Sequence, residues 1–198
     1  MPNWCNNLMT ISHNDPAMMQ KAIDAWNGDE GFLKTFFPVP YELTLVGGAR
    51  IDITKITNMD HHREMEAAIR AINKKYFGYE DWYDWCVSKW GTKWDIGGSD
   101  QYGEKAELNG DSFTARFDSA WAPPLAAYEK LTELGYYIKA YYAEFGMQFC
   151  GRWEDGIDES FEIPSTASEA RKIIPVDIDE MMGIIETVEN FEEANVCE

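Results

Sequence analysis

The clearest secondary-structure signal in this sequence is an alternating segment, KAELNGDSFTARFDSAW, at residues 105–121. It places Asn-Gly at 109–110, a pair that favours the tight turn of a β-hairpin. Beyond the turn, every second position is apolar or small, as in a strand with one buried face. These positions are Phe113, Ala115, Phe117, Ser119 and Trp121. The segment therefore predicts a β-hairpin, and so an antiparallel sheet.

Other segments supply the remaining strands and helices of the predicted fold. Period-two patterns and aromatic-rich runs bounded by Gly indicate strands, whereas apolar residues three and four apart indicate helices. The expected strands lie at 5–11, 42–46, 136–145, 147–154 and 159–163. The expected helices lie at 16–27, 60–76, 80–90, 124–134 and 177–191. The helix at 60–76 has an apolar stripe formed by Met65, Ala68, Ile69, Ile72 and Tyr76.

The order of these elements predicts the fold class. With the helices at about 28–90 treated as an insertion, the order matches the split strand-helix-strand pattern of ferredoxin-like α+β folds. We therefore predict one ferredoxin-like α+β domain at 1–163, with an antiparallel sheet and its helices on one face. Residues 164–198 are predicted to form an acidic, helical C-terminal appendage.

The charge of the chain restricts its partners. It has 17 Lys and Arg against 35 Asp and Glu, a formal charge of -18. Phosphate backbones are repelled by such a protein, so direct nucleic-acid binding is not expected. Residues 154–198 contain 14 acids against Arg171 and Lys172, and so carry 12 of the 18 excess negative charges. An acidic surface of this kind favours solubility, and it is also suited to a basic partner.

The predicted C-terminal helix is amphipathic, with acids opposite an apolar stripe. The stripe consists of Ile178, Met181, Met182, Ile185, Val188 and Phe191. Such a stripe is buried either on its own domain or on a partner, which includes a homodimer. The candidate partner-binding acids are Glu180, Glu186, Glu189, Glu192 and Glu193.

Cysteines and histidines argue against a metal centre. Cys5, Cys86, Cys150 and Cys197 stand far apart and form no CxxC pair, so neither a zinc site nor a disulfide framework is expected. Adjacent histidines at 61–62 point about 100° apart on a helix. No phosphate-binding loop or nucleophile motif is present. We predict no metal, no cofactor and no enzymatic activity, and the lack of a signal peptide or long apolar run predicts a cytoplasmic protein.

The stretch KWGTKWDIGG at 89–98 concentrates aromatic and charged side chains around Gly91, which permits a tight turn. These rings offer flat apolar faces that can stack a base or grip a peptide, and Lys93 and Asp95 can pair or present charge. The other interpretation is that the tryptophans belong to the core and the charges face solvent. The candidate ligand-binding residues are Trp90, Lys93, Trp94, Asp95 and Trp121, with Tyr102 and Arg116 as further members.

Three motifs, MPNWCNN at 1–7, KWGTKWD at 89–95 and SAWAPP at 119–124, resemble the YubB-type ferredoxin-like family of small phage and conjugative-plasmid proteins. The resemblance covers residues 1 to about 155. The family usually has Asn where this chain has Lys89, and often Thr and Ser where it has Ser119 and Ala122. The resemblance implies a ferredoxin-like fold and a mobile element in a bacterial host. It implies no catalytic residue.

These observations predict a non-enzymatic acidic binding protein of a phage or mobile element. Its expected partner is a host protein, and nucleic-acid mimicry that inhibits host defence is one form of this interaction. The alternative is a small-ligand or nucleotide-binding module that uses the aromatic cleft. No membrane partner is expected, and a homodimer is left open.

Overall fold

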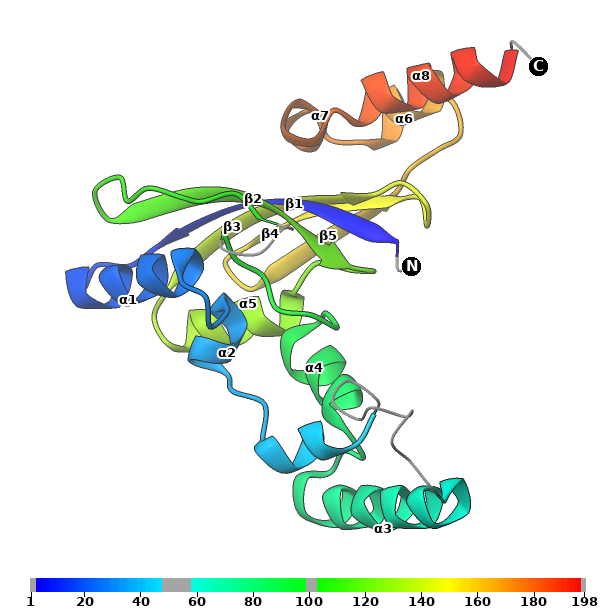
Figure 1. Cartoon of the computed structure of the whole chain (residues 1–198). Helices are drawn as coiled ribbons and strands as arrows, with labels where there is room; N and C mark the ends of the chain where they lie inside the picture. The colour runs from blue at the N-terminus through cyan, green and yellow to red at the C-terminus, as the bar shows by residue number, and fades with distance from the viewer. Residues whose placement is uncertain (1–2, 48–57, 99–102, 197–198) are drawn as a thin grey trace.

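A five-stranded antiparallel sheet lies at the centre of the computed structural model, which describes residues 3–47, 58–98 and 103–196 (Figure 1). Its strand order is β2-β1-β3-β4-β5, so the N-terminal strand pairs with both β2 and β3. The strands are β1 (Trp4–Ser12), β2 (Ser112–Ala120), β3 (Tyr137–Glu144), β4 (Phe149–Glu154) and β5 (Ile157–Glu162).

Helices lie on both sides of this sheet (Figure 1). The first side has α1 (Pro16–Asn27), α2 (Phe32–Phe36), the 3-10 helix η1 (Tyr41–Leu45), α3 (Met59–Phe77), α4 (Trp82–Trp90) and α5 (Leu125–Glu133). The other side has α6 (Ala167–Ile173), α7 (Val176–Met182) and α8 (Ile184–Val196). Within the described ranges, no helix combines the length and the apolar character that crossing a membrane requires.

Alternation along the strands builds a hydrophobic core on each face of the sheet. Met9 of β1 and Ala140 of β3 are buried in the core that also contains residues of α1 and α5. The next residue of β3, Tyr141, points to the opposite face, because successive strand side chains alternate. There it packs in a second core with Ile178 of α7 and Val188 of α8. The buried apolar residues of the C-terminal segment therefore hold it on its own sheet, whereas Met181 and Phe191 of the predicted stripe are 40% and 56% exposed.

The predicted α+β class is confirmed by this architecture. β2, α5 and β3 form a split β-α-β unit, because β2 and β3 are both antiparallel to β1, which lies between them. A ferredoxin-like order, β-α-β-β-α-β, contains two β-α-β units. Here β1 and β2 are instead adjacent and antiparallel. The ferredoxin-like assignment therefore stays a prediction.

The predicted hairpin at 105–121 is wrong in its first arm. Its turn is present, and the N–H groups of Asn109 and Ser112 each donate to the other's carbonyl, at 2.8 and 3.2 Å. Residues 105–108 are not a strand, because the Asn27 side chain occupies both backbone groups of Ala106, at 2.8 and 3.1 Å. β2 pairs with β1 instead.

Two further predicted elements are corrected. The strand predicted at 42–46 is the 3-10 helix η1 over most of its length. The single helix predicted at 177–191 is two helices, because Gly183 adopts a left-handed conformation, with φ 64° and ψ 40°, that ends α7. Helix α6 is absent from the prediction, although Thr166 and Glu169 form a capping-box pattern, and the Thr166 hydroxyl accepts from the N–H of Glu169 at 3.3 Å.

Candidate ligand-binding site

A pocket of about 430 Å³ lies between η1, α4 and the segment that follows α4. Its lining combines aromatic rings from Tyr41, Trp82, Trp90 and Trp94 with the side chains of Lys34 and Lys93. Pockets of this size, with apolar walls and a few polar groups, are typical of small-ligand sites. Four of the five predicted ligand-binding residues, at 90 and 93–95, line it.

Trp90 is fixed in the wall of this pocket. It is 1% exposed, and its indole N–H donates to the carbonyl of Phe37 at 3.0 Å. Helix α4 ends directly after it, because Gly91 has a φ of 86°. A Cβ at Gly91 would lie 2.9 Å from the backbone nitrogen of Leu125, so α4 can approach the start of α5 only with glycine here. Trp90 is therefore both a core residue and a pocket residue.

Asp95 organises the chain around the pocket. Its carboxylate accepts hydrogen bonds from the N–H groups of Leu33 at 2.6 Å, Lys34 at 2.9 Å and Ile96 at 2.8 Å. It thereby satisfies the first amides of α2, which otherwise lack partners within the helix. A Cβ at Gly31, where φ is 93°, would lie 2.4 Å from a carboxylate oxygen of Asp95. The role of Asp95 is thus to hold α2 against the pocket, and its side chain does not face solvent as the core interpretation expected.

Burial raises the pKa of two acidic groups in this pocket. For Asp95, the three amide hydrogen bonds oppose this rise in pKa. Burial also raises the pKa of the Cys86 thiol to about 12. A thiol with this pKa is protonated at neutral pH and is a weak nucleophile.

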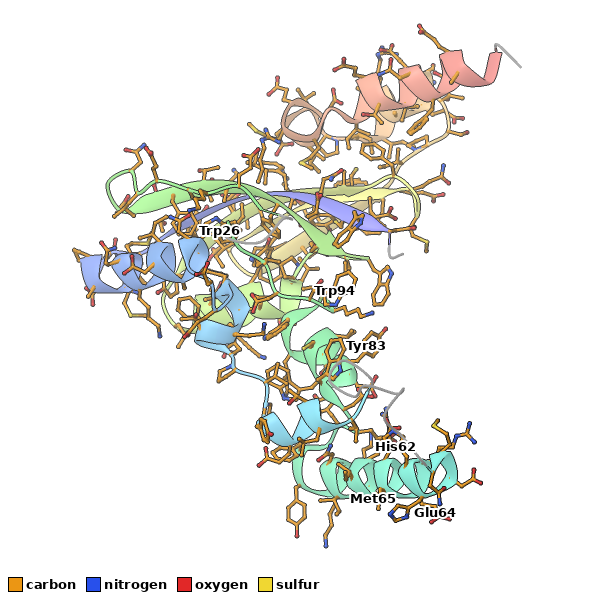
Figure 2. The ribbon with its side chains drawn as sticks, in the orientation of Figure 1. Trp26, His62, Glu64, Met65, Tyr83 and Trp94 are labelled. Atoms are coloured by element: carbon orange, nitrogen blue, oxygen red, sulfur yellow. The ribbon has the colours of Figure 1, made fainter. Side chains whose placement is uncertain are left out.

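Lys93 is surrounded by aromatic rings. Its ammonium nitrogen lies 4.7 Å from the ring centroid of Trp94, 5.4 Å from that of Trp121 and 5.6 Å from that of Tyr83. Figure 2 shows Trp94 and Tyr83 in this region, where α4 approaches the sheet. Cation–π contacts within about 6 Å stabilise an ammonium group without neutralising it. The rings therefore hold a positive charge at the pocket.

The three motifs that carry the family resemblance meet at this place. Trp4 of the first motif packs on Trp94 of the second, with ring centroids 5.5 Å apart. The backbone N–H of Trp121, in the third, donates to the carbonyl of Asn3 at 2.9 Å. The Thr92 hydroxyl pairs with the backbone of Ala120, at 3.1 Å to its nitrogen and 3.3 Å to its oxygen. The three motifs, which are separated by about 30 and 90 positions in the chain, thus form one cluster.

Trp121 itself occupies an unusual position in this cluster. It does not line the pocket but contacts Lys93 and Tyr83, and it is 38% exposed. Its φ of 69° is left-handed, a conformation that a tryptophan rarely adopts and that costs energy. The surrounding hydrogen bonds enforce it, since the Ser119 hydroxyl donates to the carbonyl of Ala122 at 2.7 Å. Strain of this kind is often found at binding sites.

Of the two further predicted members, only Arg116 belongs to the described residues. Tyr102 lies outside the described residues. Arg116 is exposed on β2, beside a separate hollow of about 420 Å³ that Asn6 and Asp118 also line. The prediction that Arg116 assists Lys93 is therefore wrong.

Several members of the pocket had no signal in the sequence. Trp82, which lines the pocket, and Tyr83, whose ring contacts Lys93, belong to a helix whose period was predicted, but no local pattern distinguishes a site aromatic from a core aromatic. Lys34 belongs to α2, a helix that the sequence analysis did not predict, and its ammonium is 3.9 Å from the carboxylate of Asp95. Only the fold brings residues 34 and 95 together.

The predicted partner-binding acids of α7 and α8 fall into two groups. Glu180, Glu186 and Glu193 are exposed. Glu189 forms an ion pair with Arg171 of α6, and a carboxylate oxygen of Glu192 accepts from the N–H of Ala167 at 3.1 Å. The first group faces solvent, whereas the second joins α8 to α6.

Among the described residues, no three histidine, cysteine or acidic side chains are grouped as a metal ion would require.

Comparisons with known proteins add little. No family model matches the chain, and no curated protein matches it. A crystal structure of the protein api92 from Yersinia pseudotuberculosis, described under the family DUF1281, is similar with a TM-score of 0.40 and 12% identity. The match covers 83% of this chain and 99% of that chain, and at this score it carries no argument about function.

Proposed function

We propose that this protein is a non-enzymatic binding module that holds a small, flat, negatively charged ligand, such as a nucleotide, in the pocket between η1 and α4. The observation that carries this proposal is the ammonium group of Lys93, held among three aromatic rings at the wall of an aromatic-lined pocket. Rings of this kind stack on a planar ligand, and the fixed cation pairs with its anionic group.

The charges near the pocket support an anionic ligand even though the whole chain is acidic. The Asp95 carboxylate is occupied by three backbone amides, so it is not directed at a ligand. The ammonium group of Lys93 makes cation–π contacts with three rings, and no carboxylate among the described residues forms an ion pair with it. A positive charge in the pocket can attract an anion although the whole chain is acidic, because salt screens charges that lie more than about 8 to 10 Å away.

The non-enzymatic part of the proposal rests on the chemistry of the pocket. Its thiol, Cys86, has a pKa of about 12 and is held protonated by burial. Its carboxylate, Asp95, performs a structural task. Binding and orientation are what the remaining lysines and aromatic rings offer.

Replacing Lys93 with glutamine is expected to weaken nucleotide binding about tenfold, because it removes one charge-assisted contact. The measurement is isothermal titration calorimetry with AMP, GMP, CMP and UMP. Lys172→Gln, an exposed lysine on α6, is the matched control and should bind as the unmodified protein does. If none of the four nucleotides releases heat with the unmodified protein, the nucleotide proposal is overturned.

A second candidate function uses the acidic surface of α7 and α8. Glu180, Glu186 and Glu193 are exposed there, on a chain with a net charge of -18. Their charge suits a basic groove on a host protein of the kind that binds nucleic acid, which is the interaction expected of a mobile-element inhibitor. This candidate and the pocket involve opposite sides of the sheet (Figure 1).

Replacing these three acids with glutamine is expected to reduce capture of a basic host protein about tenfold while α8 stays folded, because Glu189 and Glu192 are left in place. Affinity purification from a bacterial lysate, read by mass spectrometry, measures the capture. The matched control replaces three exposed acids elsewhere, Glu107, Glu129 and Glu133, and removes the same net charge. Equal capture by all three proteins would exclude this surface as the contact.

A further inference from the structure

Helix α3 is attached to the protein by its polar side. The Arg70 guanidinium forms an ion pair with Asp81 before α4, and the Glu66 carboxylate, which pairs with Arg70 within the helix, accepts from the N–H of Gly47 at 3.2 Å. The amide of Asn73, the one buried residue of α3, donates to the carbonyls of Glu42 at 3.3 Å and Glu80 at 3.0 Å. Three polar residues of α3, Glu66, Arg70 and Asn73, are therefore turned inward, although a surface helix normally turns such residues to solvent.

Four of the five residues of the predicted apolar stripe of α3 face outward, and the fifth, Ile69, is half-buried. Met65 is 53% exposed, Ile72 is 55% exposed and Tyr76 is 71% exposed, and Ala68 between them is exposed as well. These four residues follow each other at spacings of three and four, so they form one continuous strip along the helix. An exposed apolar strip of this regularity is unusual on a surface helix and marks an interaction site. The helix-in-groove and helix-on-helix modes of association use such strips.

The charges of α3 are divided between its two halves. All of its acids lie in the first half, and three of its four cations lie in the second half. The acids are Asp60, Glu64 and Glu66, and the cations of the second half are Arg70, Lys74 and Lys75. Two such helices therefore complement each other when they run antiparallel and repel each other when they run parallel.

We propose that α3 is a homodimerisation helix, and that its strip packs antiparallel on the same strip of a second copy of this chain. A two-fold axis near the middle of the helix sets Ala68 opposite Ile72 of the second copy, a small residue against a large one. In the same register Glu64 lies beside Lys75 of the second copy, and the two-fold symmetry repeats each of these contacts. The surface is thus self-complementary in both shape and charge.

The position of α3 explains why a second copy is compatible with the acidity of the chain. A charge of -18 on each copy opposes association. Figure 1 shows α3 at the end of the molecule opposite α8, so a dimer through α3 keeps the two acidic C-terminal segments far apart. Screening at physiological salt then removes most of the repulsion between them.

Ile72→Glu tests the apolar strip. It places a charge at the centre of the interface and is expected to raise the dimer dissociation constant at least about tenfold. Sedimentation velocity across a concentration series measures that constant. Because Ile72 is exposed in one copy, the variant keeps its fold, which circular dichroism checks. Met147→Glu, at a residue that is 69% exposed in the turn between β3 and β4, is the matched control and should dimerise normally.

A charge exchange tests the antiparallel register and the identity of the partner. Glu64→Lys and Lys75→Glu, made singly, each set like charges beside each other and are expected to weaken the dimer about threefold to tenfold. Made together in one chain, they restore opposite charges across the axis, so the dissociation constant should return to that of the unmodified protein.

Each outcome decides the proposal. A dimer that Ile72→Glu and the single charge changes weaken, and that the double change restores, supports it. A protein that stays monomeric at every concentration overturns it, and so does a dimer that Ile72→Glu leaves intact. Failure of the double change to restore the dimer would overturn the antiparallel register.

Discussion

Replacing Trp26 with alanine is expected to lower the free energy of unfolding by about 4 kcal/mol, the usual cost of deleting a large aromatic side chain from a packed core. Trp26 is fully buried, and its ring contacts Phe32, Phe113 and Phe117 with centroids 5.3, 5.8 and 5.4 Å away. Its indole N–H donates to the carbonyl of Glu104 at 2.8 Å, and this acceptor would lose its partner. The substitution therefore combines a cavity with a broken hydrogen bond.

Urea denaturation followed by circular dichroism measures this loss. Trp26→Phe keeps most of the ring contacts and should lose clearly less stability than alanine does. Met147→Ala, at an exposed turn residue, should change the free energy of unfolding by less than about 0.5 kcal/mol. A loss below about 1 kcal/mol for Trp26→Ala would contradict the central place of this residue in the core.

Asp95→Ala is expected to lower the free energy of unfolding by about 3 kcal/mol and to abolish the proposed ligand binding in the pocket, because it leaves three backbone amides without an acceptor. Two of these amides, of Leu33 and Lys34, belong to the first turn of α2, which would separate from the segment after α4. The wall of the pocket would then be lost together with the cap. Thermal unfolding gives the loss of stability, and calorimetry with the nucleotide panel gives the loss of binding.

Asp95→Asn tests the effect of the charge, because asparagine has no charge but keeps an oxygen that accepts hydrogen bonds. Burial raises the pKa of Asp95 in the folded protein above its value of 3.8 in the unfolded chain. The folded state therefore binds the proton more tightly, so the contribution of Asp95 to stability is complete below pH 3.8 and decreases as the pH rises through the folded-state pKa. Asparagine cannot ionise, and the stability of Asp95→Asn relative to the unmodified protein should rise over the same pH range. A constant difference between the two proteins would show that burial does not control this group.

Local signals predicted most helices and strands because they depend on neighbouring residues alone. Helix α4 is an example, since its cap, Asp81, and its stop, Gly91, both stand in the sequence beside the apolar period. The first arm of the hairpin failed for the opposite reason. Its backbone groups are taken by Asn27, which lies 79 positions away, and no local pattern announces such a contact.

The candidate site was predicted only in part, because a local pattern identifies neighbouring residues but not contacts with distant ones. The local sequence was enough to identify Trp90, Lys93, Trp94 and Asp95 as candidate site residues, because they are neighbours in the chain. The rings that surround Lys93, from Tyr83 and Trp121, and the amides that bind Asp95 come from other segments. The sequence showed which side chains could form a site, whereas the fold decided which of them contact each other.

The sequence by itself determined the α+β class, the acidity of the C-terminal segment and the amphipathic character of α3. These properties follow from the order and period of the residues, which the chain carries whether or not it is folded. Only the tertiary structure decided that the apolar strip of α3 faces outward and that Glu189 and Glu192 join α8 to α6. A periodic pattern identifies two faces of a helix, but which face is buried depends on contacts with residues that are distant in the sequence.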